Sequence, residues 1–297
     1  MMAVVLVAGA SGLFGAHAAG AFAAAGWEVR RYQRGTDMAQ AAQGADVIVN
    51  AMNPPMYHDW PRLVPAITAQ AIAAARASGA TLIVPASVYN YGSQPRPWGP
   101  STPQKPNTRK GLVRVQMEAD YRASGVPVIL LRGGDFMDAE GKSQGMGMAL
   151  RGLAKGKIMA LGGVDVPRAY AYLPDMARAA VALAAVRHSL PRFADVPFAG
   201  LTFSVQQLAA AFQAQTGQSY RITRFAWWVM RLASPFWELA REMSEMRYLY
   251  DLPHHLDGAT LRAVLPDFQT TGLAEVAAAQ LRWAGLAPQI DPKRAMA

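Results

Sequence analysis

Short apolar runs alternate with helical patterns through the first half of the chain. The apolar runs are rich in β-branched residues and predict strands at residues 2–7, 28–32, 47–50, 81–84 and 126–131. Helices are expected between them at residues 16–25, 38–42, 60–78 and 108–124. Because strands that alternate with helices usually form a parallel sheet covered on both faces, the pattern predicts an α/β fold with a doubly wound parallel sheet.

A glycine-rich turn joins the first predicted strand to the first predicted helix. Its glycines let the backbone approach a phosphate, and the helix N-terminus favours negative charge. This context indicates a Rossmann-type site for the pyrophosphate of a dinucleotide; the alternative is a glycine turn in another kind of βα unit. The residues expected to contact the cofactor here are Gly9, Ser11, Gly12, Leu13, Phe14 and Gly15.

The segment after the second predicted strand bears on the choice of dinucleotide. An acidic residue about 20 positions beyond the glycine turn would bind the ribose hydroxyls of NAD. Gln33 occupies that place here, and Arg34 follows it. Because a guanidinium binds a 2′-phosphate through paired, charge-assisted hydrogen bonds, we predict NADP as the cofactor, with NAD as the alternative.

The second half of the chain shows a weaker alternation. Helices are predicted at residues 174–185, 204–216, 227–250 and 272–284. We therefore expect a dinucleotide-binding domain over residues 1–165 and a smaller, mostly helical substrate-binding region over residues 166–297. The second region can return one strand or helix to the first domain.

Composition narrows the functional classes. The chain has 52% hydrophobic and 16% charged residues and no cysteine, which indicates a globular protein without disulfides or thiolate chemistry. Its net charge of +9 is spread over both halves, which favours anionic small molecules over nucleic acid. Residues 1–7 predict a buried strand rather than a signal peptide, and no stretch is apolar enough to span a membrane, so we expect a cytoplasmic protein.

Two further clusters have competing interpretations. The aromatic residues of 225–237 fit a membrane-surface anchor, but aromatics at helical spacing more often lie in a core or a subunit contact, which we prefer. His254 and His255 have no further ligand at metal spacing, so we expect no metal site and assign them to the surface or a substrate loop.

Several segments resemble the extended and atypical short-chain dehydrogenase/reductases, often described as NAD-dependent epimerase/dehydratases. The similar segments are the glycine turn, Asn50 to Asn53, Val84 to Gly92, Leu131 to Phe136 and Arg168 to Asp175. The resemblance implies that Ser87 is the catalytic serine. It also implies cofactor contacts from Ala51, Met52, Asn53, Ala86 and Gly133. Substrate contacts would come from Tyr91, Asp135, Phe136, Met137 and, for an anionic substrate group, Arg168.

The chain departs from this family where an active-site tyrosine precedes a lysine. The corresponding positions hold Lys110 and Arg114, and Glu118 follows, so all three lie on one helix face. The isoflavone-reductase-like members also have this pattern, and by that resemblance Lys110 is the general acid/base. Lys110 can instead be a surface lysine that binds the cofactor ribose, with Tyr89 or Tyr91 as the proton donor.

The residues and the resemblance together predict an NADP-dependent oxidoreductase. It would transfer hydride between NADP(H) and a small carbonyl, hydroxyl or conjugated substrate, with Ser87, Lys110 and Tyr89 as the catalytic candidates. One alternative is an NADP(H)-binding redox sensor or assembly factor without catalysis, because the usual Tyr–Lys pair is missing. Sugar-nucleotide epimerase or dehydratase chemistry is another. The resemblance also allows a homodimer.

Overall fold

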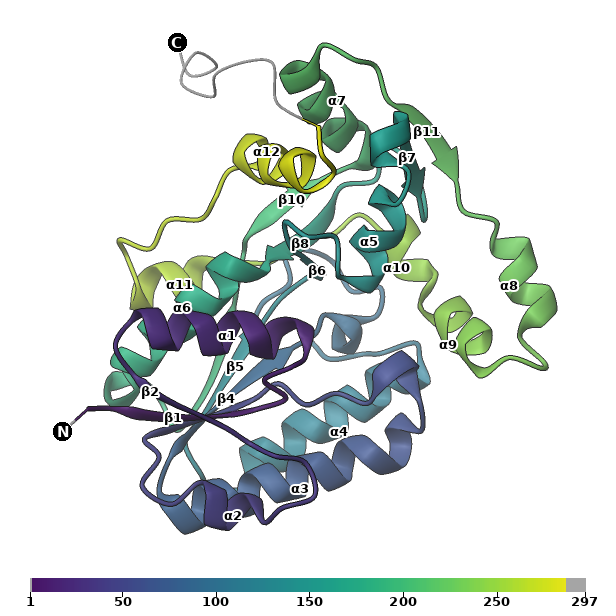
Figure 1. Cartoon of the computed structure of the whole chain (residues 1–297). Coiled ribbons are helices and arrows are strands. Elements are labelled where there is room, and N and C mark those ends of the chain that lie inside the picture. The colour runs from purple at the N-terminus through teal and green to yellow at the C-terminus, as the bar shows by residue number, and fades with distance from the viewer. Residues whose placement is uncertain (1, 287–297) are drawn as a thin grey trace. The chain divides into compact units, whose positions relative to one another are not determined.

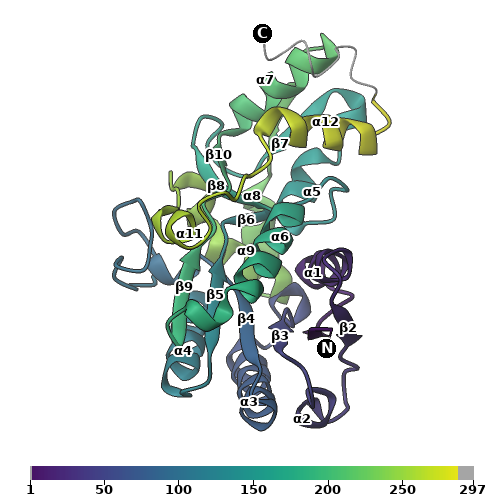
Figure 2. The same cartoon turned by 90° about the vertical axis from the view of Figure 1, so that its left-hand side faces the viewer.

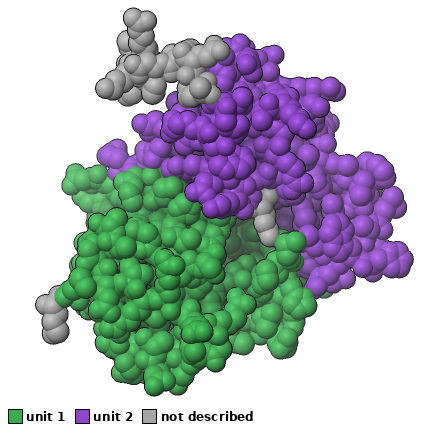
Figure 3. All heavy atoms as spheres, viewed as in Figure 1, with its two compact units in different colours: residues 1–133, 173–198, 256–268 green, residues 134–172, 199–255, 269–297 purple. Residues whose placement is uncertain are grey.

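A computed structural model describes residues 2–286 and divides the chain into two compact units. Unit 1 contains residues 1–133, 173–198 and 256–268, and unit 2 contains residues 134–172, 199–255 and 269–297 (Figure 3). The chain therefore leaves the first unit at Gly133 and returns to it twice. The sequence predicted a boundary after residue 165, with one strand or helix able to return to the first domain. Residues 287–297 of the expected second domain lie outside the described residues.

Unit 1 is built on a six-stranded, fully parallel sheet in the order β2-β1-β3-β4-β5-β9. Its strands are β1 (Val4–Ala8), β2 (Glu28–Arg31), β3 (Val47–Asn50), β4 (Thr81–Ala86), β5 (Val128–Arg132) and β9 (Phe193–Pro197). Its helices are α1 (Leu13–Ala24), α2 (Met38–Ala41), α3 (Trp60–Ser78), α4 (Arg109–Ala123), α6 (Leu173–Ala185) and α11 (Ala259–Val264). Short 3₁₀ turns are η1 (Pro55–Tyr57), η2 (Tyr89–Tyr91) and η4 (Arg187–Ser189).

Helices cover both faces of this sheet, as the sequence predicted. Figure 1 shows α1 and α6 on one face and α2, α3 and α4 on the other. On the face covered by α3 and α4, one buried cluster contains Leu6, Ile48 and Leu82 from neighbouring strands together with Val64 of α3 and Met117 of α4. Such apolar burial is the main favourable contribution to folding.

Unit 2 contains two small sheets, in the orders β10-β8-β6 and β11-β7. Its strands are β6 (Asp135–Met137), β7 (Lys157–Ala160), β8 (Arg168–Tyr172), β10 (Leu201–Phe203) and β11 (Arg221–Arg224). Its helices are α5 (Gln144–Leu150), α7 (Val205–Thr216), α8 (Trp227–Ala233), α9 (Glu238–Met246), α10 (Tyr248–Asp251) and α12 (Leu273–Trp283), with the 3₁₀ turn η3 (Leu153–Lys155). Helices α7 and α12 lie side by side in Figures 1 and 2. Helices predominate as expected, but the five strands were not predicted.

The elements predicted in the first half are present, with bounds shifted by at most three residues. The predicted helix over 227–250 is wrong as a single element, because the structure has α8, α9 and α10 there. Pro235 explains the first break, since proline has no backbone N–H to continue a helix. Among residues 2–286, no helix is long and apolar enough to cross a membrane.

The aromatic segment around α8 is mostly exposed rather than buried. Trp227 is half-buried and donates from Nε1 to the Leu161 carbonyl at 2.6 Å, but Trp228 is 62% exposed and Phe236 is 96% exposed. The core interpretation is therefore wrong for these two side chains. The subunit-contact interpretation stays a prediction.

One buried charge network joins three elements of unit 1. Arg132, at the end of β5, is 0% exposed and donates to both carboxylate oxygens of Glu118 on α4 at 2.9 Å. It also binds Asp195 of β9 through Nε at 3.1 Å and Nη2 at 2.8 Å. These carboxylates outweigh burial and raise the pKa of Arg132 well above its usual value. The guanidinium thus stays charged and fixes α4 and β9 to the sheet.

We predict that Arg132→Met lowers the free energy of unfolding by about 3–5 kcal/mol, because it leaves two carboxylates buried without a counter-ion. The matched control is Arg30→Met, which breaks the exposed 2.7 Å pair with Glu28. That change should cost about 0–1 kcal/mol. Urea unfolding followed by circular dichroism measures both; equal losses for the two variants would contradict the role of the network.

Candidate functional site

The glycine turn lies where the strand order of the sheet reverses, between the carboxyl ends of β1 and β3. Ligands of doubly wound sheets bind at such a point. Gly9 has φ +81°, and a Cβ added there would lie 2.8 Å from the Ala51 carbonyl carbon at the end of β3. The Gly12 N–H donates to the Gly9 carbonyl at 2.8 Å, which closes the turn.

Helix α1 begins directly after this turn. Its cap residue, Gly12, offers no side-chain acceptor to the first N–H groups of the helix. Ser11 and Gly12 are exposed, whereas Phe14 and Gly15 are buried. A helix N-terminus that follows a glycine turn and has no covering side chain at its cap fits the pyrophosphate of a dinucleotide.

Arg31, the last residue of β2, and Arg34 beyond it are both exposed. Arg34 is exposed and has no side-chain partner among residues 2–286. Arg30, by contrast, donates to Glu28 at 2.7 Å and to the Gln43 carbonyl at 2.7 Å. Of these two guanidinium groups, that of Arg34 is the one open to a ligand phosphate.

The segment after β3 is tied to its neighbours by hydrogen bonds. The Ala51 N–H donates to the Ala8 carbonyl at 2.9 Å, and Met52 N–H contacts Asn50 Oδ1 at 3.4 Å. Asn53 Oδ1 accepts a 2.7 Å hydrogen bond from Arg114 Nη2. The predicted cofactor segment is thus joined both to β1 and to α4.

Ser87 follows β4 and has an unused hydroxyl. Its carbonyl accepts from Arg132 Nη1 at 2.6 Å, and the neighbouring Ala86 carbonyl accepts from the Gly133 N–H at 2.9 Å. The Ser87 Oγ is buried and has no hydrogen-bond partner in the described chain. A buried hydroxyl without a partner is costly unless a ligand satisfies it.

The structure does not favour Tyr91 as a substrate or proton-transfer residue. Tyr91 is 1% exposed, and its O–H donates to the Gly99 carbonyl at 3.2 Å. Burial raises its pKa, and its ring lies 5.1 Å from the Arg132 guanidinium. Tyr91 is therefore a core residue. Tyr89 is half-buried, with its ring 6.4 Å from that of Trp60.

Helix α4 carries the three charged residues that the sequence placed on one face. Lys110 is 2% exposed, and its Nζ lies 5.1 Å from the centre of the Tyr57 ring. Arg114 is half-buried, and its guanidinium lies 4.4 Å from the centre of the Trp60 ring. Glu118 is 4% exposed and bound to Arg132. Lys110 is thus not a surface lysine.

The sequence did not lead us to expect the aromatic side chains that lie beside these two cations. Tyr57 and Trp60 have ring centres 5.3 Å apart, and Trp60 stacks on Tyr89. Met56, Tyr57 and Asp59 adopt positive φ angles of 44–62°, which L residues rarely do. Strained backbone of this kind gathers at functional sites. The sequence does not predict these positive φ angles, because none of the three residues is glycine.

Arg168 and Asp135 of unit 2 form an ion pair with each other. Arg168 Nη2 also donates to the Tyr170 hydroxyl at 2.5 Å. Burial opposes the charge, but Tyr170 and Asp135 outweigh burial and raise the pKa of Arg168. Its charge is therefore already compensated, which weakens the expectation that it holds a substrate anion.

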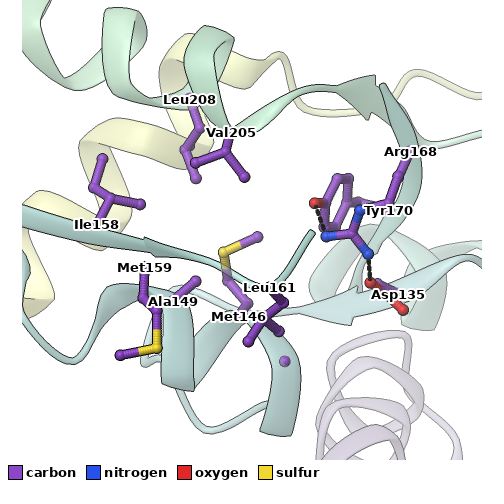
Figure 4. A pocket seen from close by; sticks show the side chains of 11 residues that line it. Asp135, Met146, Ala149, Ile158, Met159, Leu161, Arg168, Tyr170, Val205 and Leu208 are labelled. Carbon is purple, nitrogen blue, oxygen red and sulfur yellow. Dashed lines mark hydrogen bonds and ion pairs between the residues drawn. The ribbon is translucent and has the colours of Figure 1, made fainter. Parts of the chain in front are cut away.

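A pocket in unit 2 opens beside this pair (Figure 4). Apart from Asp135, Arg168 and Tyr170, its lining is apolar, from Met146, Ala149, Ile158, Met159, Leu161, Val205 and Leu208 with Gly145. Met137 does not line the pocket, because it is 0% exposed within the core cluster of unit 2. Phe136 is half-buried on β6.

His254 is buried rather than on the surface. It is 3% exposed, and its Nδ1 lies 2.8 Å from the Leu252 carbonyl. Burial lowers its pKa. Within residues 2–286, no group of three histidine or acidic side chains is placed to hold a metal ion.

The close packing of the glycine turn predicts opposite effects of two alanine substitutions in α1. A Cβ at Gly15 would lie 2.1 Å from the Gly9 carbonyl oxygen, whereas one at Gly20 has no atom within 4 Å. Gly15→Ala should therefore cost about 1–3 kcal/mol through overpacking. Gly20→Ala should stabilise by up to about 1 kcal/mol through helix propensity. Urea midpoints measure both changes in stability. Changes of the same sign for the two variants would show that the turn relaxes freely.

Comparisons with known proteins agree on the fold. No family model matches the chain, and no curated protein matches it significantly. Among solved structures, UDP-glucose 4-epimerase from Brucella ovis in complex with NAD is 18% identical, with a TM-score of 0.73 over 97% of this chain and 100% of that one. WbmH from Bordetella bronchiseptica in complex with NAD⁺ is 16% identical, with a TM-score of 0.70 over 95% of this chain and 98% of that one. RMD from Pseudomonas aeruginosa complexed with NADPH is 14% identical, with a TM-score of 0.70 over 96% and 98%. Over nearly its whole length, the chain thus has the Rossmann-type fold that these proteins share.

Proposed function

We propose that the chain is an NADP(H)-dependent oxidoreductase of the short-chain dehydrogenase/reductase superfamily. It transfers hydride between the nicotinamide and a small carbonyl, hydroxyl or conjugated substrate. The observation that carries the proposal is the glycine turn between β1 and β3, where the backbone is packed so closely that a Cβ at Gly9 would meet Ala51. The structural neighbours with NAD or NADPH in their names support a nicotinamide cofactor.

Four segments of unit 1 supply the cofactor contacts in this proposal. Residues 9–15 hold the pyrophosphate, and the exposed Arg34 binds the 2′-phosphate. The segment of Ala51, Met52 and Asn53 and the strand ends at Ala86 and Gly133 line the rest of the site. When bound, NADPH supplies the hydride.

Lys110 and Ser87 supply the proton chemistry. The Lys110 ammonium donates a proton to the substrate oxygen as hydride reaches the carbonyl carbon. The Ser87 hydroxyl, which has no partner inside the described protein, donates a hydrogen bond to the same oxygen. In this proposal, the pair takes the place of the active-site tyrosine of the family that the chain resembles. Tyr89 is the alternative proton donor.

We predict that Arg34→Ala weakens NADPH binding about tenfold or more, because a charge-assisted contact to the 2′-phosphate is lost. NADH binding should stay unchanged within about threefold, since NADH has no such phosphate. Titrations followed by nicotinamide fluorescence measure both affinities. Arg30→Ala is the control, because Glu28 and Gln43 already engage that side chain. Equal losses for NADPH and NADH would refute NADP specificity.

We predict that Lys110→Met lowers kcat at saturating NADPH by about 100-fold or more, as expected for loss of a general acid. NADPH oxidation with a panel of small carbonyls that includes methyl benzoylformate measures it. The exposed Lys155→Met is the control. If Lys110 only holds the cofactor, the Lys110→Met variant would instead have a raised Kd for NADPH and an unchanged kcat. Tight NADPH binding without turnover of any carbonyl would favour the sensor alternative.

A further inference from the structure

A short stretch of unit 2, from α8 to the start of α9, exposes five large apolar side chains. The exposed fractions run from 40% for Val229 to 96% for Phe236, and the full set is Trp228, Val229, Leu232, Phe236 and Trp237. We call these residues the α8–α9 patch; the two helices lie side by side in Figure 1. Single exposed apolar residues are ordinary, whereas a group of them within one segment indicates an interaction site.

The patch faces outward because the opposite side of α8 is already anchored. Trp227 donates from Nε1 to the Leu161 carbonyl at 2.6 Å, and its ring centre lies 5.8 Å from that of Tyr250. Successive residues of a helix are about 100° apart, so Trp228 points away from this anchor. Leu232 follows Trp228 by one turn and lies on the same face.

The backbone between the two helices is hydrogen-bonded where the most exposed ring lies. The Phe236 N–H and the Trp237 N–H both donate to the Ala233 carbonyl, at 3.0 and 2.9 Å, and Pro235 has no N–H. An unpaired polar group is costly to move out of water. These backbone groups can therefore enter less polar surroundings without that cost.

The charge around the patch is mainly positive. Arg224, at the end of β11, and Arg231 of α8 are exposed, and their side chains have no partner among residues 2–286. Arg241 of α9 is paired, with its Nε 3.3 Å from Glu242 Oε1. The acids of α9 all interact with other residues, and they are Glu238, Glu242 and Glu245. Two arginines beside the patch thus lack a negative partner.

We propose that the α8–α9 patch binds an anionic membrane surface, with the apolar side chains at the boundary between headgroups and acyl chains and Arg224 and Arg231 on the lipid phosphates. This inference goes beyond the proposed oxidoreductase function and does not depend on it. Aromatic side chains are enriched at membrane interfaces, and basic residues beside them add attraction to anionic lipids.

A second copy of the chain fits the patch less well than a membrane does. A two-fold contact places the same patch of both copies together, which brings Arg224 and Arg231 of one copy close to those of the other. Like charges repel each other, whereas anionic lipids attract both arginines. The subunit contact expected from the sequence is therefore the competing outcome of the experiment.

Flotation of the full chain with vesicles tests the apolar contribution. Phosphatidylcholine vesicles that contain about 30% phosphatidylglycerol should bind about tenfold or more tightly than phosphatidylcholine alone. Phe236→Ser should weaken this binding about tenfold, since the most exposed ring is lost. Leu232→Ser should weaken it several-fold. Its matched control is Leu112→Ser on α4, which removes a leucine of similar exposure (58% against 69%) and should leave binding unchanged.

Arginine variants test the electrostatic contribution. The double variant Arg224→Gln, Arg231→Gln should weaken binding to the phosphatidylglycerol vesicles about tenfold and leave binding to phosphatidylcholine unchanged. The control is Arg262→Gln, because Arg262 is exposed on α11 of unit 1, outside the patch. Higher salt should reduce the preference for anionic vesicles, since it screens exposed charges.

Quenching by lipids with brominated acyl chains measures insertion itself. Bound wild-type protein should lose tryptophan emission, and the double variant Trp228→Phe, Trp237→Phe should bind with similar affinity and be quenched much less. Vesicle binding without quenching, or binding that Phe236→Ser leaves unchanged, would reduce the contact to electrostatic adsorption and overturn the proposal. A dimer in light scattering that Phe236→Ser dissociates, in a protein that ignores vesicles, would assign the patch to a second copy instead. Circular dichroism checks that each variant is folded.

Discussion

The buried guanidinium of Arg132 is the contact on which the rest of unit 1 depends. It joins β5 to α4 through Glu118 and to β9 through Asp195, and it holds the Ser87 carbonyl at the end of β4. The Arg132 carbonyl also accepts from the Phe198 N–H at 2.7 Å, where the chain leaves β9. One side chain therefore fixes the last strand of the sheet, the helix that carries Lys110 and the strand end that carries Ser87.

The local parts of this arrangement could be predicted from the sequence. Strand β3 and helix α3 have the predicted bounds, because a short β-branched run and a long alanine-rich stretch ending at Gly79 each determine their own structure. The glycine turn was recognisable for the same reason, since its strand and helix directly flank it. The spacing of Lys110, Arg114 and Glu118 was enough to place them on one helix face.

The long-range parts could not be predicted. Strand β9 is only five residues long and pairs with β5, whose partner residues lie 65 positions earlier, so nothing in its own sequence shows that it joins the main sheet. The partners of Arg132 come from α4 and β9, and the stacking of Arg114 on Trp60 brings together α4 and α3. Pairings of this kind depend on topology, whereas hydrophobic periodicity reports only on a single element.

The distribution of charge along α4 depends on Arg132. A helix face with Lys110, Arg114 and Glu118 would carry one net positive charge if the three interacted only with one another. Arg132 withdraws Glu118 from this set by binding both of its oxygens. Arg114 then remains beside the Trp60 ring and the Asn53 amide, where burial opposes its charge. Glu118 offsets this effect of burial only in part. The pair of Arg132 and Glu118 thus decides how far the charge of Arg114 is compensated by its own helix.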